Sequence, residues 1–157
     1  MSEPLAPPPV ESLPELRRRL ARRHHQVGWW GLLVFLSLGI ALETLHGFKI
    51  GLYLDPPHQL RRLLWTLAHA HGALFALVHI AFAAGLERFG VWSEARLKLA
   101  SFFLIDALLL MPAGFFLGGV APSEVDPWWP GIMLVPFGAG FLLAAVALIA
   151  WGASGES

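Results

Sequence analysis

The sequence predicts an all-α integral membrane protein, an antiparallel bundle of four transmembrane helices with a short N-terminal amphipathic surface helix. The 157-residue chain is 56% hydrophobic and 14% charged, with a mean hydropathy of +0.61. Soluble proteins average about 45–50% apolar and about 25% charged residues. Four apolar stretches reach the roughly 20 residues that cross a bilayer. Short polar connections between them favour antiparallel neighbours.

The composition excludes several classes of function. The chain has no cysteine, which excludes disulfides, thiolate metal sites and cysteine nucleophiles. Its formal net charge is zero, and nothing in it indicates a nucleic-acid partner. The length fits one domain. We expect no cleavable signal peptide, because the first 15 residues are proline-rich and the apolar run after the arginines is too long for a signal-peptide core.

The N-terminal region changes character at Ser12. Residues 1–11 hold four prolines and are expected to form a disordered tail. The segment from Ser12 to Glu15 has capping-box spacing, which predicts the start of a helix over 12–26. Its leucines share one face, and five arginines surround them: Arg17, Arg18, Arg19, Arg22 and Arg23. This pattern favours a basic amphipathic helix on an anionic lipid surface. The alternative is a solvated extension of the first span.

The transmembrane domain is expected over 27–152, with residues 153–157 as a short tail. Its predicted spans are 27–47, 62–85, 97–119 and 131–151. Ser93 is a suitable N-cap for the third span, and Pro112 should kink it. Small residues spaced by four predict close helix contacts. They are Ala68, Gly72 and Ala76 in the second span, and Gly140 and Ala144 in the fourth.

The basic residues near the span ends predict an orientation. One side holds the five N-terminal arginines together with Arg88, Arg96 and Lys98, and the other side holds Lys49, Arg61 and Arg62. We therefore expect a multi-pass protein of a bacterial-type inner membrane with both termini in the cytoplasm.

Ionisable side chains inside the spans are the main indication of function, because such groups are costly in a bilayer. At about 1.5 Å per residue, Glu43 and His46 of the first span reach the same depth as the His69–His71 segment of the second. His69 and His71 are about 200° apart around their helix, so both cannot face one partner. His79 lies roughly two to three turns deeper, and Asp106 of the third span lies between the two levels.

Three chemistries fit these residues. A metal site would use Glu43, His46, His69 and His71, since imidazole and carboxylate suit Cu, Fe or Zn. The Glu-x-x-His spacing of Glu43 and His46 is typical of carboxylate-bridged bundle sites, although a dinuclear site normally uses two such motifs. A haem b would take its axial ligands from among four candidates, His46, His69, His71 and His79. A proton path through acidic and histidine side chains is the third possibility.

A purely structural interpretation stands beside these. The histidines would then join helices through hydrogen bonds, and Asp106 would be neutral or bonded to backbone freed by Pro112. His24, His25 and His58 are expected to be solvated at the interfaces.

The segment from His69 to Gly72 (His-Ala-His-Gly) resembles the histidine-bearing spans of haem-copper oxidase-related membrane proteins. The resemblance covers one span and assigns no residue roles. We expect a small redox or electron-transfer component that binds a haem or metal ion. The alternatives are an accessory or assembly subunit of a larger membrane complex without a cofactor, and a proton-conducting or transport protein. The expected partners are the lipid bilayer, anionic lipid at the N-terminal arginines, and a second copy or larger complex; whether the chain is an enzyme stays open.

Overall fold

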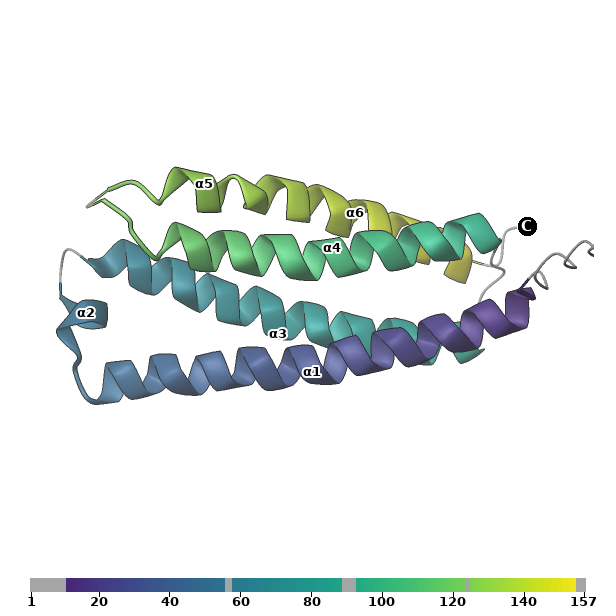
Figure 1. Cartoon of the computed structure of the whole chain (residues 1–157), viewed down its shortest axis with the longest axis horizontal. Coiled ribbons are helices and arrows are strands. Elements are labelled where there is room, and N and C mark those ends of the chain that lie inside the picture. The colour runs from purple at the N-terminus through teal and green to yellow at the C-terminus, as the bar shows by residue number, and fades with distance from the viewer. Residues whose placement is uncertain (1–10, 56–57, 89–92, 124, 155–157) are drawn as a thin grey trace, which may run out of the picture.

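The computed structural model describes residues 11–55, 58–88, 93–123 and 125–154, and all regular structure in these residues is helical. Four helices are long and apolar enough to cross a membrane, which confirms the predicted helical class and number of candidate spans. They lie along one long axis of the molecule (Figure 1). The elements are α1 (Leu13–Gly47), α2 (Gly51–Leu54), α3 (Gln59–Arg88), α4 (Glu94–Gly118), α5 (Trp129–Ile132) and α6 (Leu134–Ala153).

Helix α1 is one continuous element of 35 residues. Its start has the predicted cap, since the Ser12 backbone N–H and hydroxyl both donate to the Glu15 carboxylate, at 2.9 and 2.7 Å. Leu16 and Leu20 are buried in a cluster with residues of α3 and α4. The separate surface helix expected over 12–26 is therefore not a distinct element. The helix continues because buried positions recur every four residues, which keeps one face against the bundle.

Helix α3 packs between α1 and α4, and α6 packs on α4. The small residues of α3 lie at these interfaces, as predicted, and Ala68 and Ala76 are fully buried. On α1, a Cβ at Gly28 would stand 2.8 Å from the Ala76 carbonyl oxygen, so the two backbones approach closely.

The predicted close contact at Gly140 of the fourth span is wrong. A Cβ at Gly140 would meet nothing within 4 Å, whereas one at Gly138 would stand 2.7 Å from the Met111 backbone nitrogen. Positions two apart on a helix point about 200° away from each other, so only one of these glycines faces α4. The fourth span also differs in continuity, since a turn at Met133 separates α5 from α6.

Helix α4 begins as predicted, with the Ser93 hydroxyl oxygen accepting from the Arg96 backbone N–H at 3.3 Å. It continues past Pro112, which is fully buried inside it.

The outer surface of the bundle is strongly apolar. In the most apolar windows of α1 and α6, only 11% of the residues are buried within the chain. Large hydrophobic side chains therefore face outward; they include Leu33, Val34 and Ile40 of α1, and Phe137 and Leu143 of α6.

Candidate functional site

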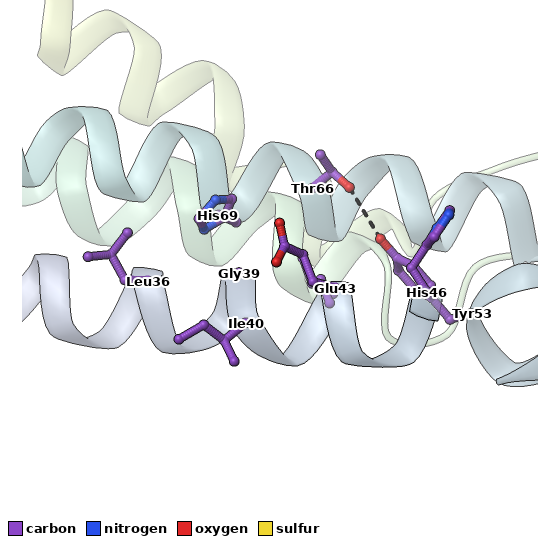
Figure 2. A pocket seen from close by; sticks show the side chains of 9 residues that line it. Leu36, Gly39, Ile40, Glu43, His46, Tyr53, Thr66 and His69 are labelled. Atoms are coloured by element: carbon purple, nitrogen blue, oxygen red, sulfur yellow. Dashed lines mark hydrogen bonds between the residues drawn. The ribbon is translucent and has the colours of Figure 1, made fainter. Parts of the chain in front are cut away.

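A pocket with both polar and apolar lining lies between α1 and α3 near the end of the bundle that carries α2. Its volume is about 400 Å³. Figure 2 shows its lining side chains, which come from all three of these helices. The lining residues are Leu36, Gly39, Ile40, Leu42, Glu43, His46, Tyr53, Thr66 and His69. The structure thus brings three of the sequence-selected residues, Glu43, His46 and His69, to one place.

His69 is held by a hydrogen bond that fixes its ring orientation and its neutral tautomer. Its Nδ1 lies 2.7 Å from the backbone oxygen of Phe35 on α1. Because a carbonyl oxygen only accepts, Nδ1 carries the hydrogen, and Nε2 of the neutral ring keeps a lone pair. Gly39 makes this arrangement possible, because a Cβ there would collide with the His69 ring. His69 therefore presents a basic nitrogen from a fixed ring.

Glu43 and His46 approach the pocket from α1, about one turn apart. Both side chains are exposed, and the Glu43 carboxylate points from α1 toward α3 (Figure 2). The His46 ring lies edge-on to that of Tyr53, with centroids 6.5 Å apart. Tyr53 is buried, and its hydroxyl lies 3.5 Å from the Thr66 hydroxyl. Helix α2 thus closes one side of the pocket with a polar edge.

The pocket continues toward the start of α3. A second cavity shares His46, Tyr53 and Thr66 with the first and extends to Gln59 and Arg62. The two cavities are therefore neighbours that share polar lining groups.

His71 does not belong to this pocket. Its Nδ1 lies 2.8 Å from the Leu67 backbone oxygen of its own helix. Its ring packs against Phe75 and against Phe115 of α4, with centroids 6.0 and 5.0 Å away. The separation of about 200° from His69 turns it toward the opposite side of α3. Of the four metal ligands expected from the sequence, three therefore line one pocket, and His71 lies elsewhere.

His79 belongs to a different, fully buried cluster. Its Nδ1 lies 2.6 Å from Nδ1 of His24, and its Nε2 lies 3.2 Å from the Leu104 backbone oxygen. Nε2 of His24 lies 2.8 Å from the Ser101 hydroxyl. The cluster joins α1, α3 and α4, and none of its side-chain atoms contributes to the α1–α3 pocket.

The expectation that His24 is solvated is wrong, since the residue has no exposed surface. The signal that would have found it is the spacing of Leu16, Leu20, His24 and Gly28, four residues apart on one helical face. Its neighbour His25 is exposed and accepts from Trp29 Nε1 at 3.2 Å. His58 is half-buried, with Nδ1 2.9 Å from the Gly51 backbone oxygen.

Asp106 makes no hydrogen bond to either histidine cluster through its buried oxygen, but it shares a pocket with Ser101. It lines a pocket of about 410 Å³ between α1 and α4, together with Arg19, Arg23, Lys98 and Ser101. Its Oδ2 is buried and has no hydrogen-bond partner among the described residues. The expected bond to backbone freed by Pro112 is therefore not formed by this oxygen.

The histidine and carboxylate side chains of the described residues, as they are placed, form neither a complete metal site nor a haem slot at Gly72. Within the described residues, no three His, Asp or Glu side chains are close enough together to hold a metal ion as they stand. The space beside Gly72, which a flat cofactor would need, is filled by the Phe35 ring. The pocket thus offers one fixed imidazole nitrogen and two exposed, rotatable ligand groups, and no slot for a planar macrocycle at Gly72.

Comparison with known proteins gave no match, whether to family models, to curated proteins or to solved structures.

Proposed function

We propose that the chain is an integral membrane protein whose four long helices cross a bilayer as an antiparallel bundle. The exposed apolar side chains of α1 and α6 support this, because a large outward apolar surface suits lipid and not water. The arginine-rich start of α1 and the start of α4 lie at the same end of the molecule (Figure 1). This gathering of basic residues supports cytoplasmic termini in a bacterial-type inner membrane.

Within that bundle, we propose that the α1–α3 pocket binds a transition metal ion and that the protein serves as a small redox or electron-transfer component. The single observation that carries the proposal is the hydrogen bond that His69 Nδ1 makes to a backbone carbonyl. A metal-binding histidine nearly always donates its other ring N–H to a carbonyl or carboxylate, which fixes the ring and its tautomer. The bond from His69 Nδ1 to the Phe35 oxygen is of this kind.

Glu43 and His46 would complete the ligand set. Both are exposed, so each can change rotamer toward His69 Nε2 at little cost in packing. Imidazole with carboxylate suits Cu, Fe or Zn, and of these Cu and Fe carry electrons. The filled space at Gly72 favours a metal ion over a haem.

Elemental analysis and an absorption spectrum of the detergent-purified protein test this proposal. A stoichiometric transition metal supports it, and a Soret band would instead support haem ligation by the histidines. Protein purified without metal that also fails to bind Cu²⁺, Fe²⁺ or Zn²⁺ in equilibrium dialysis would refute it.

A second function is favoured by the remaining histidine bonds. His24, His79 and His69 each connect one helix to another, as expected for an accessory or assembly subunit whose histidines only join helices. That function predicts that His69→Leu weakens assembly of a membrane complex while metal content is unaffected. Co-purification of partner subunits with wild-type and variant protein distinguishes the two.

A further inference from the structure

In the buried cluster of His24, His79 and Ser101, the donor and the acceptor of each hydrogen bond can be assigned. The Leu104 carbonyl only accepts, so His79 Nε2 carries a hydrogen and donates it. In a neutral ring this leaves a lone pair on His79 Nδ1, which must accept from Nδ1–H of His24, 2.6 Å away. His24 Nε2 then has the lone pair and accepts from the Ser101 hydroxyl at 2.8 Å.

This one-directional series of hydrogen bonds satisfies both histidine rings within the protein. Each ring nitrogen of both histidines has a partner, and the three donors point in sequence from Ser101 through His24 and His79 to Leu104. A buried polar network of this kind is stable as long as every member is satisfied.

One end of this hydrogen-bond series, at Ser101, borders a pocket. Ser101 lines the pocket of about 410 Å³ between α1 and α4, which is large enough for several water molecules. The same pocket holds Asp106, whose Oδ2 is buried without a hydrogen-bond partner among the described residues. The other end stops at a backbone carbonyl, so protons can enter and leave only on the Ser101 side.

We propose that His24 and His79 form a buried binding site for a single proton, which is exchanged through Ser101 with the pocket that holds Asp106. On uptake, Ser101 gives its hydroxyl hydrogen to His24 Nε2 and receives one from a hydronium ion or a protonated carboxyl group in the pocket, which becomes water or a carboxylate. One O–H bond breaks in the pocket, one N–H bond forms on His24, and the serine is regenerated. No heavy atom has to move, because the Ser101 oxygen then accepts from Nε2–H instead of donating to it.

The geometry limits the site to one proton. His24 can carry hydrogens on both nitrogens while His79 Nδ1 still accepts. A second proton would place hydrogens on both Nδ1 atoms, which are 2.6 Å apart, and so would break the bond between the rings. The pair therefore titrates as a unit.

The charged groups around the site come from two helices. From α1, Arg19 and Arg23 line the pocket. From α4, Lys98 and the carboxyl group of Asp106 also line the pocket. No charged residue of α3 lines this pocket in the described part of the chain. Asp106 is thus the counter-charge for the bound proton.

This inference goes beyond the proposed metal site, with which it shares no residue. It is tested by ¹⁵N NMR of histidine-labelled protein in lipid nanodiscs. Near neutral pH, the hydrogen is expected on Nδ1 of His24 and on Nε2 of His79. On acidification, the resonances of both rings should shift with one midpoint as a single proton adds to His24 Nε2.

Two outcomes of the titration overturn the proposal. Either both rings stay neutral until the protein unfolds, or the two rings protonate independently. The first would leave the cluster as a structural connection between helices and nothing more.

The role of the pocket is tested by Asp106→Asn, which should lower the proton affinity of the pair about tenfold or more because it removes the counter-charge. The matched control is Asp126→Asn, the same substitution at an exposed side chain of the loop between α4 and α5. Equal effects of the two variants would contradict exchange through the Asp106 pocket.

Discussion

Replacing His24 by leucine should destabilise the protein, whereas the same change at its neighbour His25 should not. His24 is fully buried and bonds to His79 and Ser101 across two helix interfaces. His25 is exposed, and its bond to Trp29 lies within one helix. The two variants thus remove the same side chain from adjacent positions of α1 with opposite burial.

The expected magnitude follows from what each change leaves unpaired. Without His24, the Ser101 hydroxyl can donate to the carbonyl four residues earlier on its own helix. His79 Nδ1 loses its only donor and stays buried, which costs about 1–3 kcal/mol. Leucine fills most of the space of the lost ring, so little is added for a cavity. At the exposed His25 position, the change in unfolding free energy should stay within about 0.5 kcal/mol.

Equilibrium unfolding in detergent measures the difference, because the chain has seven tryptophans whose fluorescence reports unfolding. Midpoint and slope should be compared, since a changed slope would indicate a different unfolding transition. Equal stabilities of His24→Leu and His25→Leu would refute the buried three-helix cluster. If only His25→Leu lowered the stability, the face of α1 that packs against the bundle would be the one that carries His25 and not His24.

Two further predictions concern helix packing. Gly28→Val should lower the free energy of unfolding by about 1–3 kcal/mol, because a Cβ there would stand 2.5 Å from Ile80 Cγ1. Gly140→Val, at a site with nothing within 4 Å, serves as the neutral control in the same unfolding assay. Arg61→Gln should cost about 1 kcal/mol, since its guanidinium donates to the Gly119 backbone oxygen at 3.0 Å; hydrogen exchange of the segment after α4 should accelerate, and unchanged exchange there would contradict this anchoring role.

The long helices could be predicted from sequence because each depends on local composition alone. Hydropathy located all four, and the rise per residue placed Glu43 and His46 at the depth of His69 before any contact was known. The same arithmetic separated His71 from His69 by azimuth, and the structure places these two histidines on different sides of α3.

The buried cluster could not be predicted in this way. Whether His24 is inside depends on α1 continuing without a break, and an arginine-rich segment of this kind is equally typical of a helix lying on a membrane. Likewise, small-residue spacing marks Gly140 and Ala144 but not Gly138, and only the rotation of α6 against α4 places Gly138 at the contact. Such features are set by tertiary packing and not by local pattern.

The proposed metal pocket is tested most directly by comparing two histidines that are two residues apart. Metal content and Cu²⁺ affinity should be measured for wild-type protein, His69→Gln and His71→Gln under one purification protocol. The pocket geometry predicts that His69→Gln lowers the affinity at least about tenfold while His71→Gln leaves it unchanged. Equal loss in both variants, or no binding by the wild-type protein, would contradict it.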